Sequence, residues 1–79
     1  MVTVLRSGGF RVVIYLDDHE PAHVHVIKDG EAKISLSGPE DEPELVWTVG
    51  FTNADVRKAM RMVVDAREAL LKRWNEIHG

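Results

Sequence analysis

No glycine or proline occurs between residues 51 and 78, whereas the first 50 residues contain all three prolines and five of the six glycines. Glycine and proline favour turns, because glycine tolerates positive φ and proline cannot donate a backbone hydrogen bond. The chain is therefore divided into a half broken by turns and a half that can form continuous helix. Its 79 residues suffice for one small domain. Within it we expect a sheet region at residues 1–50 and a helix in residues 51–79.

The first half is expected to form four or five short antiparallel strands. In residues 10–16, Phe10, Val12 and Ile14 share one face, which is the pattern of a strand with one covered side. Turn sequences that contain glycine separate neighbouring runs of this kind. The expected strands are residues 2–6, 10–16, 23–28, 31–37 and 45–49.

The second half predicts one long helix packed on that sheet, which makes an α+β fold. Thr52 and Asp55 have the spacing of a capping box, so the helix should begin at about Asn53. A helix of about 25 residues is about 38 Å long, whereas a strand of about seven residues spans about 23 Å. The last turns, with Trp74 and Ile77, should therefore extend beyond the sheet. One hypothesis is that a second copy of the chain covers them in a homodimer, and the alternative is that the N-terminal strand or a curved sheet covers them within one chain.

The Asp29-Gly30 pair is typical of a two-residue type I′ turn, in which both central residues have positive φ. In the register of that turn His25 faces Ile34 and His23 faces Leu36. Because Ile34 and Leu36 belong to the apolar face of their strand, both histidines are expected on the face that the helix covers. Their buried nitrogens would then need hydrogen-bond partners or a metal ion.

Most residues with chemical potential lie close together in the sequence. Residues 17–26 hold three of the four histidines and three carboxylates, namely Asp17, Asp18, His19, Glu20, His23 and His25. Neutral imidazole is a common metal ligand, and residues two apart on a strand point to the same side. One hypothesis is therefore a metal site formed by His19, His23 and His25, with zinc as the ion. The carboxylates would supply an oxygen ligand or accept the second ring N–H of a histidine.

Two further hypotheses use the same histidines without a metal. In one, His23 and His25 act as general acid and base in phosphodiester cleavage, with Arg11 or Lys33 stabilising the phosphate. In the other, which the sequence alone favours, the loop is a structural corner whose histidines and carboxylates satisfy one another or the backbone. No cofactor other than zinc is expected.

The charge distribution limits the choice of partners. The net charge is −3, so direct binding to nucleic acid is not expected. Four carboxylates lie in one loop, Glu40, Asp41, Glu42 and Glu44. The sequence favours a solvated connection for this loop. The alternative is a surface for a basic or nucleic-acid-binding partner protein, with Trp74 and Ile77 as further partner contacts. The lack of cysteine fits a reducing compartment, and no apolar run suggests a signal peptide or a membrane span. We therefore expect a cytoplasmic protein without membrane contact.

Four segments carry a resemblance to a known family. They are residues 3–6 (TVLR), 8–10 (GGF), 18–26 (DHEPAHVHV) and 74–76 (WNE). With them the chain resembles the bacterial family catalogued as domain of unknown function 4160, in which a second proline usually stands at the position of Ala22. The resemblance implies a small protein of toxin–antitoxin-like or mobile-element loci that acts with a protein partner.

From the resemblance we predict a small protein-interaction module of a toxin–antitoxin-like or phage/defence-related locus, which is not an enzymatic function. Two alternatives stay open. One is a histidine-dependent or metal-assisted ribonuclease or phosphodiesterase. The other is an acidic phage-type inhibitor that blocks a nucleic-acid-binding complex.

Overall fold

The computed structural model describes residues 1–79 and has the α+β architecture predicted from the sequence. Its five antiparallel strands lie in the order β1-β2-β3-β4-β5, so each pairs with its neighbour in the sequence. The strands are β1 (Val2–Ser7), β2 (Phe10–Ile14), β3 (His23–Ile27), β4 (Glu31–Ser35) and β5 (Glu44–Val49). A short 3₁₀ helix, η1 (Pro39–Asp41), precedes β5, and the helices α1 (Asn53–Asp65) and α2 (Arg67–His78) follow it. Neither α-helix is long and apolar enough to cross a membrane.

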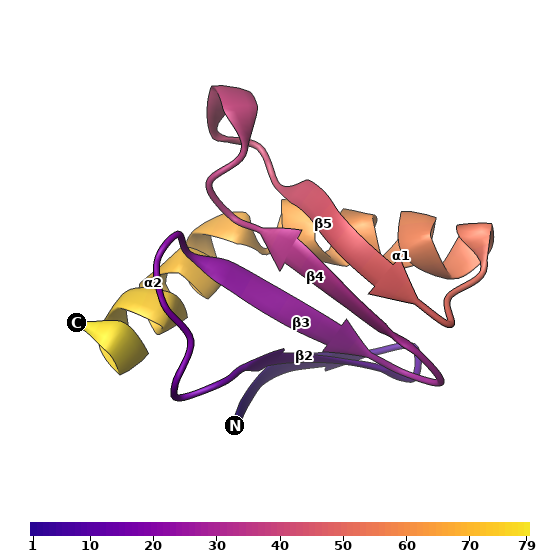
Figure 1. Cartoon of the computed structure of the whole chain (residues 1–79), viewed down its shortest axis with the longest axis horizontal. Helices are drawn as coiled ribbons and strands as arrows, with labels where there is room; N and C mark the ends of the chain where they lie inside the picture. The colour runs from indigo at the N-terminus through magenta and orange to yellow at the C-terminus, as the bar shows by residue number, and fades with distance from the viewer.

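Both helices lie on the same side of the sheet (Figure 1). The core forms between them and the apolar face of the strands, to which alternate residues contribute. The strand residues of this core are Phe10, Val12, Ile14, Val24, Val26, Ala32 and Ile34, and the helix residues are Ala59, Val63, Leu70 and Trp74. Burying a side chain such as valine or isoleucine stabilises a fold by about 1.5–3 kcal/mol, so this face holds the sheet and helices together.

The other side of the sheet, which we call the open face, carries the alternate residues. Across β2, β3, β4 and β5 one row of paired residues crosses this face, consisting of Val13, His25, Lys33 and Trp47. Because His25 belongs to this row, the predicted position of the histidines beneath the helix is wrong.

The error comes from the turn between β3 and β4. Ile27 pairs with Glu31, so three residues form the loop instead of two. Neither Asp29 nor Gly30 has positive φ, so the type I′ turn is not formed. Glycine is needed for another reason, because a Cβ at Gly30 would collide with the carbonyl oxygen of Val49 on β5. The register therefore moves by one residue, and such a shift turns every side chain of one strand to the opposite face relative to its partner.

The type I′ geometry occurs instead between β1 and β2. Gly8 and Gly9 have φ of +58° and +84°, and the flanking Ser7 and Phe10 are paired. Both central residues are glycine, so neither has a side chain that positive φ would strain.

The helical half begins as predicted but does not form one helix. Thr52 and Asp55 complete the capping box before α1. The helix breaks at Ala66, whose φ and ψ are −104° and 10°, and the next residue, Arg67, donates from Nε to the carbonyl oxygen of Leu36 at 3.0 Å. This hydrogen bond joins the start of α2 to the segment that follows β4.

The break removes the reason for expecting a dimer through the C-terminal helix. Trp74, which was predicted to need a partner, is 1% exposed within its own chain, and Ile77 packs against the same core. Trp74 is therefore a core residue of its own chain.

Candidate functional site

His23 and His25 lie on the open face of β3, yet they are only 6% and 8% exposed. Aromatic rings pack around them. The His25 ring contacts Tyr15 and Trp47, with ring centroids 4.6 and 5.8 Å away, and the His23 ring lies 5.1 Å from the Trp74 ring. The two imidazoles are therefore largely desolvated, although they are not in the main core.

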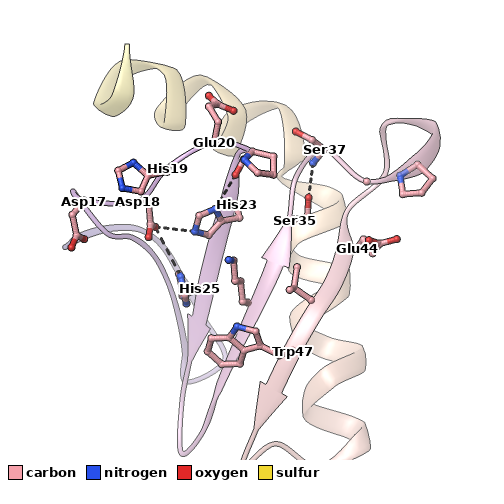
Figure 2. Close-up of a pocket in the computed structure, with 15 residues that line it drawn as sticks. Asp17, Asp18, His19, Glu20, His23, His25, Ser35, Ser37, Glu44 and Trp47 are labelled. Atoms are coloured by element: carbon pink, nitrogen blue, oxygen red, sulfur yellow. Dashed lines mark hydrogen bonds and ion pairs between the residues drawn. The ribbon is translucent and has the colours of Figure 1, made fainter.

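The loop between β2 and β3 brings Asp18 to the two histidines. The backbone N–H of Tyr15 donates to Asp18 Oδ2 at 3.1 Å, and the N–H of Asp18 donates to the carbonyl oxygen of Tyr15 at 3.1 Å. These bonds close a tight turn and fix the carboxylate. Asp18 Oδ2 lies 3.2 Å from His23 Nε2 and 4.0 Å from His25 Nε2. Dashed lines in Figure 2 mark both contacts. Nitrogen or oxygen atoms of Asp18, His23 and His25 all lie within 4.8 Å of one another.

The opposite nitrogen of each ring is already engaged. His23 Nδ1 lies 2.9 Å from the carbonyl oxygen of Pro21, and His25 Nδ1 lies 2.8 Å from Glu31 Oε2. Because a carbonyl oxygen and a carboxylate accept hydrogen bonds, we assign the Nδ1 proton to both rings. In the neutral rings the Nε2 lone pairs then face the carboxylate oxygen of Asp18.

Burial lowers the pKa of His25, and its hydrogen bond to Glu31 opposes this shift without cancelling it. The ring of His25 is therefore neutral at pH 7. Burial, together with the negative charge of Glu31, raises the pKa of Tyr15. The Tyr15 phenol thus keeps its proton and donates to Glu31 Oε2 at 3.5 Å.

Electron-pair donors thus converge from Asp18, His23 and His25, and a cation must balance them. It can be a proton held between His23 and Asp18, or a metal ion held by all three side chains. Two histidines and one carboxylate form a common ligand set for divalent metals, and their Nδ1–H groups are oriented by acceptors, as metal-bound histidines usually are. A tetrahedral ion with bonds of about 2.1 Å separates its ligand atoms by about 3.4 Å, and the distances of 3.2 and 4.0 Å from Asp18 Oδ2 to the two rings lie on either side of this value.

A cleft of about 680 Å³ adjoins this group. Its walls come from the β2–β3 loop, the first half of β3, the second half of β4, the segment that follows β4 and the first half of β5 (Figure 2). Charged groups in the wall include Lys33 on β4 and three exposed carboxylates, Asp17, Glu20 and Glu44. A small molecule could therefore reach the ligand set from the cleft.

Helix α2 also supports the site. Trp74 Nε1 donates to Glu20 Oε1 at 3.0 Å, and the Trp74 ring packs on His23. The helix that fills the core thereby holds the loop that carries Asp18.

The other predicted site residues lie apart from this group. His19 is exposed and lines the cleft, but it is not one of the converging ligands (Figure 2). Three predicted partner-binding carboxylates, Glu40, Asp41 and Glu42, are exposed in and just after η1, and Glu44 begins β5.

Sequence reasoning named Asp18 only as one of three carboxylates, and it missed Glu31 and Tyr15 as partners of the site. The correct pairing of β3 with β4 would have placed Glu31 on the histidine face. Tyr15 could have been found from its position one residue beyond β2, on the same alternating face as Val13.

Comparison with protein families identifies one match. The profile of the family described as domain of unknown function (DUF4160) matches residues 9–75, which include the whole histidine segment and most of both helices. Comparisons with curated proteins and with solved structures found no match. The chain therefore belongs to the family of domain of unknown function 4160.

Proposed function

We propose that the chain binds a divalent metal ion through Asp18, His23 and His25 and uses it in hydrolysis. The observation that carries this proposal is the convergence of His23 Nε2 and His25 Nε2 on Asp18 Oδ2, at 3.2 and 4.0 Å. Zinc suits nitrogen and oxygen ligands, and catalytic zinc sites typically combine three protein ligands with one position for water.

The chain's own groups would prepare this site before the ion arrives. Pro21 and Glu31 orient the two rings, and the Tyr15 N–H holds the carboxylate. Such outer partners commonly change metal affinity 10- to 100-fold. A bound zinc ion would lower the pKa of a water ligand toward about 7 and polarise the oxygen of a substrate.

The metal-free alternative assigns the same groups to acid–base chemistry. A proton between His23 and Asp18 would make a histidine–aspartate pair, and His25 would be the neutral base. His25 Nε2 lies 4.0 Å from Asp18 Oδ2, beyond hydrogen-bond distance. That separation suits two ligands of one ion better than a direct proton exchange.

The proposal is tested by titrating zinc and manganese into the chelator-treated protein at pH 7, with stoichiometry checked by elemental analysis. We expect one zinc ion per chain in the wild type. Asp18→Asn removes the charge but keeps an oxygen for the Tyr15 N–H, so it should fold and lose zinc affinity at least tenfold. His25→Gln should behave in the same way.

His19→Gln is the matched control, because His19 lies in the same loop but outside the converging group. Its zinc affinity should equal that of the wild type. Absence of stoichiometric binding in the wild type, or equal affinity in Asp18→Asn, would refute the site. Hydrolysis of bis(p-nitrophenyl) phosphate with and without zinc then tests the catalytic part, and zinc-independent cleavage would favour the acid–base alternative.

A second candidate function is protein binding at the edge of β5. This strand has a neighbour on one side only, and Val46, Trp47 and Val49 on it are 51%, 40% and 68% exposed. An unpaired edge can accept a strand from another protein. The acidic residues around η1 lead directly into it, so a basic strand is the best complement.

This second candidate is the interaction module that the family resemblance suggested. In a toxin–antitoxin-like locus the partner would be the product of the neighbouring gene. If that partner binds nucleic acid, the chain would act as an inhibitor when it covers the partner's basic groove.

Coexpression with the neighbouring gene product tests this candidate. Val49→Lys should abolish copurification, since a charge on an edge strand opposes further pairing. Val64→Lys is the matched control, because Val64 is 52% exposed but belongs to helix α1 and not to a strand. Equal copurification of both variants would exclude the β5 edge.

A further inference from the structure

Two further residues lie beside the proposed metal ligands. Lys33 on β4 pairs with His25, and Trp47 on β5 pairs with Lys33. Since paired residues of neighbouring strands point to the same face, the imidazole, the ammonium and the indole form a row. All three side chains line the cleft.

Lys33 supplies an unpaired positive charge in this row. No carboxylate lies within 4.0 Å of its Nζ, although Asp18 and Glu31 lie close to the neighbouring His25. Its ammonium group is therefore free to bind an anion that also reaches the metal ligands. Phosphate is such an anion, because it has several oxygens that can be shared between a metal ion and a lysine.

Trp47 supplies a flat apolar surface at the other end of the row. Its ring lies 5.8 Å from that of His25, and 40% of the residue is exposed. An exposed tryptophan beside a positive charge is suited to stacking with a planar ring, and every nucleobase offers such a ring.

We propose that the cleft binds a nucleoside phosphate ester, with its phosphate between Lys33 and the metal ligands and its base on Trp47. This inference rests on the proposed metal-dependent hydrolysis and names its substrate class. In the reaction, a water oxygen forms a bond to phosphorus, the P–O bond to the nucleoside breaks, and the nucleoside oxygen takes up a proton from that water. The products are the phosphate and the nucleoside.

Exposed carboxylates in the cleft wall favour a mononucleotide over a long nucleic acid. Asp17, Glu20 and Glu44 are exposed residues of the cleft wall, so they would repel the phosphates of a polymer that continues beyond the site. A mononucleotide has only the phosphate that Lys33 and the metal ion receive.

The test is a titration of the zinc-loaded protein with adenosine monophosphate. Binding is measured by calorimetry and by NMR of the two indole N–H signals. Ribose 5-phosphate lacks the base and adenosine lacks the phosphate, so each probes one half of the site. We expect adenosine monophosphate to bind at least about tenfold more tightly than either, given the typical strength of base stacking on an aromatic side chain. The Trp47 signal should shift more than that of Trp74, whose ring is buried.

Two substitutions separate the halves. Lys33→Met keeps the apolar part of the side chain and should weaken the binding of adenosine monophosphate and of ribose 5-phosphate about equally. Trp47→Leu should lower the affinity for adenosine monophosphate about tenfold and leave the affinity for ribose 5-phosphate unchanged. Lys58→Met, on the exposed surface of α1, is the control and should leave all affinities unchanged.

The zinc titration distinguishes failure of this inference from failure of the metal site. If zinc binds one to one but Lys33→Met and Trp47→Leu keep wild-type affinity for adenosine monophosphate, the nucleotide assignment is wrong and the metal site stands. If zinc does not bind, both are wrong. If a single-stranded RNA binds more tightly than adenosine monophosphate, the mononucleotide class is overturned.

Discussion

The two faces of the sheet place alternate residues of β3 in opposite environments. Val24 and Val26 enter the core beneath the helices, whereas His23 and His25 face a cleft and a carboxylate. All four are buried, so exposure does not distinguish them. What differs is the chemistry of their neighbours, which is apolar on one side and rich in hydrogen-bond acceptors on the other. A strand of five residues thus holds the fold together and builds a candidate site at the same time.

The largest expected effect comes from the covered face. Ile34→Ala should lower the free energy of unfolding by about 3 kcal/mol, because it removes a fully buried side chain and leaves a cavity. Lys33→Ala, one residue earlier on the open face, should change it by less than about 0.5 kcal/mol. Chemical denaturation of both variants measures the contrast. Similar losses in the two variants would show that the faces do not differ in their contribution to stability.

Zinc should stabilise the fold only through the ligands on the open face. At a free concentration about 100-fold above its Kd, it should raise the free energy of unfolding by about 2.7 kcal/mol. In a domain of this size each kcal/mol raises Tm by about 4–8 °C, so thermal unfolding followed by circular dichroism would detect the change. Asp18→Asn should abolish the rise, and an equal rise in this variant would contradict the proposed ligands.

The turn that decides the faces should tolerate no side chain at Gly30. Gly30→Ala should cost about 2 kcal/mol of unfolding free energy, because its Cβ would meet the backbone of Val49 and Gly50. Gly8→Asn is the comparison, since asparagine accepts positive φ and nothing lies within 4 Å of a Cβ there. Denaturant titration should give Gly30→Ala a much lower free energy of unfolding than Gly8→Asn. The reverse order would show that close packing is not the reason for glycine at position 30.

The smallest effect is expected from pH at the start of α1. The backbone N–H of Thr52 donates to Asp55 and lowers its pKa below the ordinary value of 3.8, with Lys28 contributing further. The ionised carboxyl therefore stabilises the folded state fully above about pH 4, and this contribution disappears as the pH falls through the lowered pKa. Wild type should be slightly more stable than Asp55→Asn at pH 7 and lose that advantage in acid. An advantage that persists at pH 2 would rule out ionisation as its source.

Local patterns were predictable where the cause lies within a few residues. The capping box at Thr52 and Asp55 satisfies backbone donors of the same turn, and alternation within residues 10–16 shows a strand whatever its neighbours are. The candidate site was predictable in part for the same reason, since Asp18, His23 and His25 lie within eight residues of one another.

Prediction from the sequence failed where contacts with distant residues decide the local conformation. Asp29-Gly30 has the composition of a type I′ turn, but the approach of β5 to Gly30 accounts for the glycine, and a three-residue loop results. Residues 51–78 contain no helix breaker, yet the helix bends at Ala66, where Arg67 bonds to Leu36. Glu31 joins His25 only because of the register that the loop imposes.

The sequence by itself determined the α+β class, the consecutive strands and the start of the helical half, because side-chain periodicity, glycine and capping groups act over one or two turns of chain. Only the tertiary structure decided which face the histidines occupy, where the helix divides and which groups surround the rings. Those features depend on contacts such as Gly30 with Val49 and Trp74 with Glu20, whose partners are far apart in the sequence and meet only when the sheet and helices have packed.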